Sequence, residues 1–213
     1  SDRLGDVHAV GIGPGLGTGG VVDELVRKLV ENDELPVVFD ADALNAMAAG
    51  KILQVRGPAV LTPHPGEWRR LAAACGVVGE PIAPETRVRA ASDLVRALDG
   101  GGGPVAMVLK GAGTVVTDGG RFWRCPIREP ALAAGGSGDV LTGIIAGLLA
   151  QFHPRNGEHA RPDRLDLFSA TCLAVQLHAS AAVGWSSKHG SSGMLARDLV
   201  QQIPHARGLL GRV

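Results

Sequence analysis

The sequence lacks net charge, and this absence narrows the class of partner. Its 21 basic side chains are balanced by 21 acidic ones, so no overall field is available to hold a nucleic-acid backbone or an anionic membrane surface. The three tryptophans are scattered and offer no platform on which bases would stack: Trp68, Trp123 and Trp185. We expect a small-molecule partner and no nucleic acid.

Cysteine is also scarce, and the cysteines present form no pattern. Cys75, Cys125 and Cys172 are odd in number, far apart and in no C-x-x-C spacing. This spacing argues against a disulfide framework or a zinc site. The first ten residues lack a basic segment followed by an apolar one, so they do not predict a secretory signal. A cytoplasmic location fits these observations.

Long hydrophobic runs are missing as well. The apolar stretch 140–153 is too short to cross a bilayer, and the stretch 171–187 carries Gln176, His178 and several serines. We interpret both as buried helices and expect no membrane partner. His178 and Met47 lie on apolar helical faces and are predicted to belong to the core.

What is present is an alternation of strand and helix patterns. Short apolar runs rich in β-branched residues predict strands, and longer amphipathic stretches between them predict helices. The predicted strands are 7–12, 36–40, 59–62 and 105–110, with an antiparallel pair around the turn at 118–120, and the predicted helices are 21–31, 65–75, 85–98, 137–151, 163–184 and 193–203. The polar stretch 151–164 is interpreted as a surface loop. We therefore predict one α/β domain over residues 1–213, with a mostly parallel sheet, mixed at one edge and covered by helices on both faces.

Five motifs follow predicted strands or open predicted helices, where ligands of such sheets bind. They are PGLG (14–17), DADALN (40–45), TPHPGE (62–67), KGAGT (110–114) and GGSGD (135–139). We expect all five on one rim of the sheet.

The GGSGD motif predicts an anion-binding turn. Gly135, Gly136 and Gly138 allow close approach of a ligand, and the helix that follows directs free amides and its positive dipole end toward it. Asp139, in the first turn of that helix, is suited to act as a base toward a hydroxyl group. The alternative is an ordinary glycine-rich turn with a common first-turn aspartate.

The other strand-end motifs each allow two interpretations. Lys110 and Thr114 can meet a nucleotide, or Lys110 is a solvated lysine that ends a strand. His64, between two prolines, can contact substrate, or it caps a helix with Pro65 first and Glu67 as the capping carboxylate. In DADALN, Asp40 and Asn45 can orient a substrate hydroxyl or a magnesium water shell, whereas Asp42 is expected to cap a short helix.

The segment from Gly15 to Gly20 also satisfies the dinucleotide-binding pattern G-x-G-x-x-G, and Asp40 lies twenty residues further on. Pro14 interrupts that glycine turn, and the second anion-binding turn at 135–139 is not needed by a simple dehydrogenase. An NAD-dependent dehydrogenase is therefore the weakest of the alternatives.

In this order, the five motifs and the closing GMLARDLVQQIP resemble the ADP-dependent NAD(P)H-hydrate dehydratases, a branch of the ribokinase-like superfamily. The resemblance implies a three-layer α/β/α fold and repair of hydrated nicotinamide cofactors. In that reaction ADP phosphorylates the added hydroxyl, AMP is released, and loss of phosphate restores NADH or NADPH.

Carried over to this sequence, the resemblance makes Asp139 the catalytic base. ADP, with Mg²⁺, would be held by two segments, Lys110, Gly111, Ala112, Gly113 and Thr114, and Gly135, Gly136, Ser137 and Gly138. The NAD(P)H hydrate would be contacted by Gly15, Gly17, Asp40, Asn45, His64 and Asp139. The resemblance also implies a homo-oligomer, a homotetramer.

Two departures from the family are visible. Ala134 stands where members usually have threonine, with Glu129 in the approach, so phosphate affinity is expected to suffer. Members also begin earlier, and we expect part of the substrate site and a sheet edge to be missing from this chain. The alternatives that remain are a ribokinase-like kinase of a vitamin precursor, of hydroxymethylpyrimidine or hydroxyethylthiazole type, and a catalytically silent nucleotide-binding module.

Overall fold

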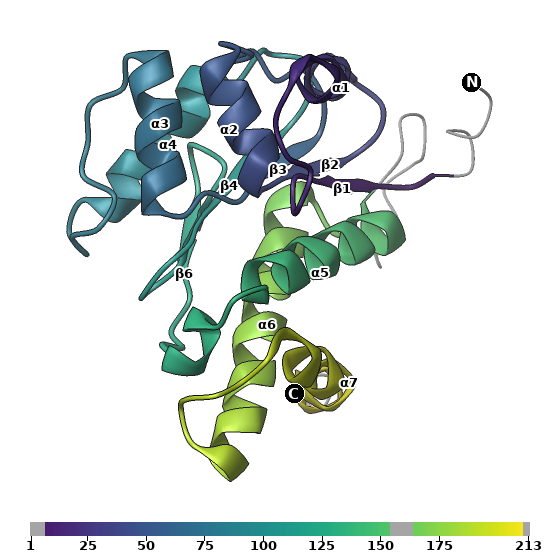
Figure 1. Cartoon of the computed structure of the whole chain (residues 1–213), viewed down its shortest axis with the longest axis vertical. Coiled ribbons are helices and arrows are strands. Elements are labelled where there is room, and N and C mark those ends of the chain that lie inside the picture. Colours follow the sequence, from purple (N-terminus) through teal and green to yellow (C-terminus); the bar gives the residue numbers. More distant parts are fainter. Residues whose placement is uncertain (1–6, 154–163, 211–213) are drawn as a thin grey trace.

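The fold is a six-stranded sheet between helices, seen in a computed structural model that describes residues 7–153 and 164–210. Sheet strands and helices alternate through the first half of the chain, and the last third is helical (Figure 1). The strands are β1 (Val10–Ile12), β2 (Val37–Phe39), β3 (Ala59–Leu61), β4 (Val105–Leu109), β5 (Val115–Thr117) and β6 (Phe122–Arg124). The helices are α1 (Gly20–Val30), α2 (Ala41–Ala49), α3 (Pro65–Cys75), α4 (Arg87–Leu98), the short 3-10 helix η2 (Pro130–Ala133), α5 (Ser137–Phe152), α6 (Leu167–His189) and α7 (Ala196–Leu210).

The order of strands in the sheet is their order in the chain, β1 to β6. Strands β1 to β4 run parallel, and β5 and β6 pair antiparallel at the edge beside β4. The mixed edge and the hairpin predicted around 118–120 are therefore confirmed. Because β1 to β4 are parallel, their carboxyl ends meet at one edge of the sheet, which is where four of the five motifs begin.

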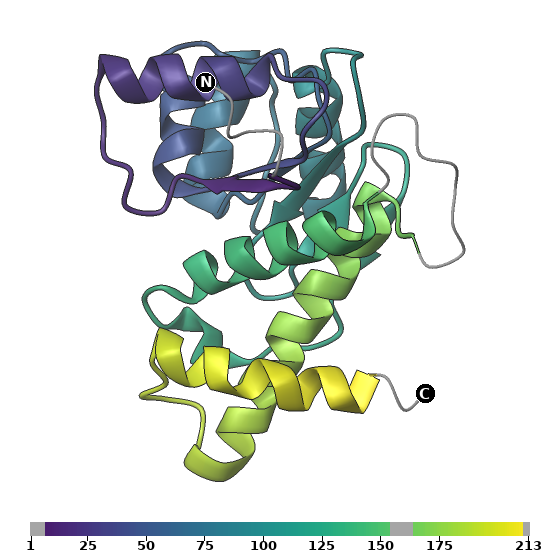
Figure 2. The same ribbon diagram turned by 90° about the vertical axis from the view of Figure 1, so that its right-hand side faces the viewer.

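Alternate side chains of each central strand enter different cores, as the two-residue period of a strand requires. In β4, Val105, Met107 and Leu109 pack with helices α1 to α4, while Ala106 and Val108 pack with α5 and α6 on the other face. Two views at right angles show this layering, with α7 lying on α6 and away from the sheet (Figures 1 and 2). The predicted three-layer α/β/α arrangement is confirmed.

Helix α6 is long and apolar enough, by length and composition, to cross a membrane. In this structure it is the central helix of the second face, with its first half in the core beneath the sheet and its second half, including Trp185, packed on α7. More than half of its most apolar 18-residue window is buried. Its His178 and the α2 residue Met47 are buried, as predicted.

Most predicted boundaries agree with the structure within a few residues, and the larger differences are at ends, including that of α6, which ends at His189, five residues later than predicted. Strand β1 begins at Val10, three residues later than predicted. Helix α7 was expected to end before Pro204, but it continues to Leu210 because Ile203 and Ala206, on either side of the proline, both pack on α6. Most of the loop predicted at 151–164 lies outside the described residues.

Candidate active site

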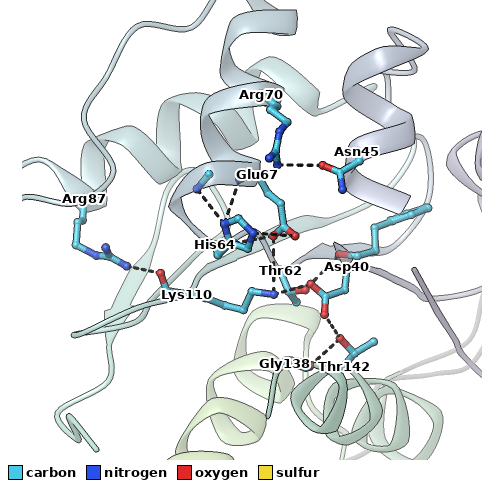
Figure 3. A network of polar contacts seen from close by, with 12 residues as sticks. Asp40, Asn45, Thr62, His64, Glu67, Arg70, Arg87, Lys110, Gly138 and Thr142 are labelled. Atoms are coloured by element: carbon cyan, nitrogen blue, oxygen red, sulfur yellow. Dashed lines mark hydrogen bonds and ion pairs between the residues drawn. The ribbon is translucent and has the colours of Figure 1, made fainter. Parts of the chain in front are cut away.

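The motifs predicted to share one rim are joined there by direct contacts, and Figure 3 shows residues of four of them, all except PGLG. The amide of Gly17, after β1, donates to the Asp42 carboxylate on α2 at 2.8 Å. Asp40, after β2, meets Lys110, after β4. The turn before α5 is brought to the same place because Thr142, on α5, donates to Asp40 at 2.8 Å. The prediction of a single rim is confirmed.

A buried ion pair lies at the centre of this rim. The Lys110 ammonium is 2.6 Å from Asp40 Oδ1 and 3.9 Å from the Glu67 carboxylate. The Asp40 side chain is 1% exposed and that of Lys110 is 19% exposed. The interpretation of Lys110 as a solvated strand end is therefore wrong, because the carboxylate at the end of β2, two strands away in the sheet, fixes the ammonium inside the rim.

The end of β4, where the KGAGT loop begins, is fixed by a buried arginine. The guanidinium of Arg87 donates to the carbonyl oxygens of Leu109, Lys110 and Pro81 at 2.8, 3.0 and 2.6 Å. Burial lowers the pKa of Arg87, and nearby Arg124 lowers it further. Arg87 thus orders the loop that carries Lys110, a role that no motif in the sequence indicated.

The TPHPGE motif builds a helix cap that fixes an imidazole. His64 Nδ1 accepts the amides of Gly66 and Glu67 at 2.9 and 3.3 Å, and Glu67 accepts the amide of His64 at 2.8 Å. The predicted capping box, with Pro65 in the first turn, is confirmed. A nitrogen that accepts two amides carries no proton, so the neutral ring holds its proton on Nε2. Gly66 leaves room for the ring, since a methyl group there would lie 2.8 Å from its Cε1.

Two residues of DADALN differ from their expected roles. Asp42 does not cap α2: it lies inside the helix, and its carboxylate holds the PGLG loop through Gly17. Capping was the wrong prediction because Asp40 occupies the N-cap position, with its side chain turned to Lys110 instead. The Asn45 amide oxygen accepts from Arg70 at 3.1 Å, so Asn45 orients a guanidinium at the outer part of the rim.

The first turn of α5 presents backbone donors without a side-chain cap. Gly136 adopts the left-handed conformation, with φ at 81°, and makes no capping hydrogen bond. Two contacts of Ser137 hold the turn in place: Ser137 Oγ donates to Leu132 O at 2.6 Å, and Ser137 O contacts His178 Nε2 on α6 at 2.9 Å. The exposed Asp139 carboxylate has no hydrogen bond or ion pair with the residues that the structure describes. The turn thus has the form of an anion site with one free carboxylate beside it.

Burial keeps the His178 imidazole neutral in the folded protein. Burial lowers the pKa of His178 to about 4, with a smaller contribution from Lys110, although the hydrogen bond to Ser137 opposes this. Because the unfolded chain binds this proton and the folded one does not, stability falls as pH decreases from about 6.5 to about 4. This residue alone costs about 3 kcal/mol across that window.

His178→Gln is therefore expected to flatten the pH dependence of the free energy of unfolding in this window, measured by urea titration. Burial also lowers the pKa of His153, so some dependence will persist. His205→Gln, at an exposed position, is the matched control and should keep the full slope. An unchanged slope in His178→Gln would contradict the assignment.

A cavity of about 660 Å³ opens between the KGAGT loop and the first turn of α5. Seven of the predicted site residues line it: His64, Lys110, Gly111, Ala112, Thr114, Ser137 and Gly138. Its other walls come from the segment after β6, from α5 and from α6. They include Glu129 and Ala134, which were noted as departures from the family, and residues that sequence reasoning missed: Cys125, Ile127, Arg128, Pro130, Leu132, Ala133, Leu141, Val175, His178 and Ala179. Most are apolar, a lining suited to a planar ring with a few polar groups at one end.

The remaining predicted site residues lie outside this lining. Gly113, Gly135 and Gly136 belong to the two loops without lining the cavity, and Gly15, Gly17, Asp40, Asn45 and Asp139 lie elsewhere on the rim. Cys125 lines the cavity as a buried, free thiol, and burial raises its pKa. It is therefore a packing group in the wall.

No cluster of three or more histidine, cysteine or acidic side chains suited to a metal occurs among residues 7–153 and 164–210. Mg²⁺ is commonly held by one or two carboxylates together with substrate phosphates and water. The exposed Asp139 beside the anion-binding turn fits a metal that arrives with phosphates, and no all-protein cage is present in the described part.

Sequence comparison gives the decisive observation. The sequence profile of the NAD(P)H-hydrate dehydratase family matches residues 1–205. The chain belongs to this family. It is 39% identical to the bifunctional NAD(P)H-hydrate repair enzyme Nnr of Coxiella burnetii over 200 residues, and 37% identical to that of Escherichia coli. These alignments cover 93% of the chain but 36% and 34% of the relatives, so the dehydratase-family chain spans about a third of their length.

Solved structures agree with this assignment. The ADP/ATP-dependent NAD(P)H-hydrate dehydratase of Bacillus subtilis, co-crystallized with ATP and Mg²⁺, superposes with a TM-score of 0.72 and 30% identity over 97% of this chain and 68% of its own. A ribokinase-like superfamily protein of Enterococcus faecalis superposes with a TM-score of 0.71 at 24% identity, covering 93% of this chain and 63% of its own. The fold of this dehydratase-family chain is therefore ribokinase-like.

Proposed function

We propose that this protein is an ADP-dependent NAD(P)H-hydrate dehydratase that repairs hydrated nicotinamide cofactors. The observation that carries the proposal is the cavity, which two motifs of the family, KGAGT and GGSGD, line together while a free carboxylate stands beside the second. Family membership over residues 1–205 supports the same reaction.

The residues divide into two groups along the rim. The nucleotide would lie in the cavity against Lys110 to Thr114, with its transferable phosphoryl group at the backbone amides of the α5 turn, 135–138. The hydrate would lie on the side of Gly15, Gly17 and His64, whose Nε2 lies 3.3 Å from the Glu67 carboxylate and is held in place by it.

The chemistry assigned to the chain is proton transfer and charge stabilisation. Asp139 would take the proton of the hydrate hydroxyl group. The hydroxyl oxygen would then form a bond to the β-phosphorus of ADP, and AMP would leave as that phosphorus loses its bond to the bridging oxygen. Phosphate then leaves with that oxygen, and the adjacent ring carbon loses a proton, which restores the ring double bond. Mg²⁺ bound with the phosphates would neutralise their charge.

Three finer points are part of this proposal. The use of ADP is supported by the family, whose structure from Bacillus subtilis is described as ADP/ATP-dependent. The resemblance to the family supports a homo-oligomer. The three free cysteines support a cytoplasmic location.

The test is to give the protein hydrated NADH, ADP and Mg²⁺ and to follow the near-ultraviolet absorbance of reduced nicotinamide. We expect an increase that requires ADP. No increase from a folded protein that binds ADP in calorimetry would refute the dehydratase and would favour a silent nucleotide-binding module. A stable phosphate ester formed from a vitamin precursor would favour the kinase.

A further inference from the structure

Asp40 was expected to contact substrate, yet its carboxylate is fully used inside the protein. Oδ1 accepts from the Lys110 ammonium at 2.6 Å and Oδ2 accepts from Thr142 Oγ1 at 2.8 Å. The carboxylate is buried at the end of β2, and Asp40 is not among the residues that line the cavity, whereas Lys110 and Gly138 are. Figure 3 shows Asp40 lying between Lys110 and Thr142.

The first turn of α5 lies directly on this ion pair. A methyl group at Gly138 would stand 3.4 Å from Lys110 Nζ and 3.7 Å from Asp40 Oδ2. One turn later, Thr142 is buried and bonds the same carboxylate. Gly138 and Thr142 are four residues apart and lie on one face of α5. The absence of a side chain at Gly138 and the hydroxyl group of Thr142 thus allow this face to pack directly on the ion pair.

Lys110 retains hydrogen-bonding capacity in this arrangement. An ammonium has three protons; one is used by Asp40, and the Glu67 carboxylate is farther away, at 3.9 Å. The side chain lines the cavity. Asp40 therefore fixes the ammonium in place without using all its donors.

We propose that Asp40 is a positioning residue that holds Lys110 and the first turn of α5 in a fixed relative position, so that the ammonium and the backbone amides of that turn converge on one phosphoryl group. This inference rests on the proposed function. It moves Asp40 from substrate contact to alignment of the two segments that would hold the nucleotide. A misplacement of about 1 Å in such a group can cost about 10²-fold in rate.

Three variants test this role through separate measurements of kcat, KM and ADP affinity. Asp40→Asn is expected to lower kcat by about 10²-fold while the KM for the hydrate changes little. Thr142→Val, which removes only the hydroxyl, should lower kcat by about 10-fold, and Thr142→Ser should restore it, since each tenfold corresponds to one hydrogen bond of ordinary strength.

A readout that needs no turnover is trace acetylation of lysines followed by peptide mass spectrometry. The chain has four lysines, and Lys28, Lys51 and Lys188 serve as internal references. Lys110 should be labelled slowly in the wild-type protein and faster in Asp40→Asn, with ADP slowing the wild type further. This measurement remains interpretable if the protein repairs no hydrate, so it separates the positioning role from the proposed function.

Any one of three results would overturn the inference. A folded Asp40→Asn variant with wild-type kcat and unchanged Lys110 labelling would show that the pair aligns nothing. A rise in the KM for the hydrate at unchanged kcat would return Asp40 to direct substrate contact. A lower melting temperature with unchanged kcat would show a purely structural role and would also refute the proposal.

Discussion

Asp139→Asn is expected to lower kcat by about 10³- to 10⁴-fold while ADP binding persists. Asparagine keeps the shape of the side chain but cannot accept the proton of the hydrate hydroxyl. The carboxylate is exposed and has no partner among the described residues, so its loss should leave folding intact. Removing a negative charge beside the phosphate site should leave ADP affinity equal or tighter, because like charges no longer repel. Turnover assays and calorimetry measure the two effects.

The matched control is Asp23→Asn, the same substitution in the first turn of α1. It should keep kcat near the wild-type value, because Asp23 lies outside the proposed machinery. A rate in Asp139→Asn within about 10-fold of wild type would show that another group takes the proton. Loss of ADP binding together with activity would instead place Asp139 in nucleotide affinity.

Gly13→Ala is expected to produce the largest loss of stability, about 3–5 kcal/mol. Gly13 has φ at 127°, and a methyl group there would lie 1.7 Å from the carbonyl oxygen of Asp40. Either the end of β1 or the start of α2 must move, and both carry parts of the rim. For a domain of this size the melting temperature should fall by about 6–20 °C, as measured by calorimetry.

Gly15→Ala separates the cost of steric overlap from the cost of the left-handed backbone conformation. Gly15 also has a positive φ, 65°, but a methyl group there meets nothing within 4 Å. Only the left-handed strain applies, about 1 kcal/mol. If both variants lost the same stability, close contact with Asp40 would not be the reason for glycine at position 13.

The sequence was sufficient to predict the layers because the relevant patterns are local. The continuous apolar run VAMVL and the spacing in PGEWRRLAAAC each depend on neighbours within one element, and both elements lie where they were predicted. The capping box at His64 was likewise visible, since all its members lie within four residues.

The parts that could not be predicted depend on contacts between distant residues. Lys110 and Asp40 are seventy residues apart, and nothing in either motif indicates that one neutralises the other. The same holds for Arg87, which acts on carbonyl groups of β4. The wall supplied by α6 was missed because Val175, His178 and Ala179 have the helical spacing of ordinary core residues.

The second face of the sheet has a consequence for how the protein is made. Strands β1 to β6 and helices α1 to α4 are synthesised before α5 and α6, and neighbouring strands in the sheet are consecutive in the chain, so each can join the one before it. The apolar side chains on the other face, among them Val38, Val60 and Val108, have no cover until α5 and α6 are synthesised. During that interval the nascent chain exposes an apolar surface that is prone to aggregation. The anion-binding turn arrives with the same segment, so the candidate site is completed only when this cover is in place.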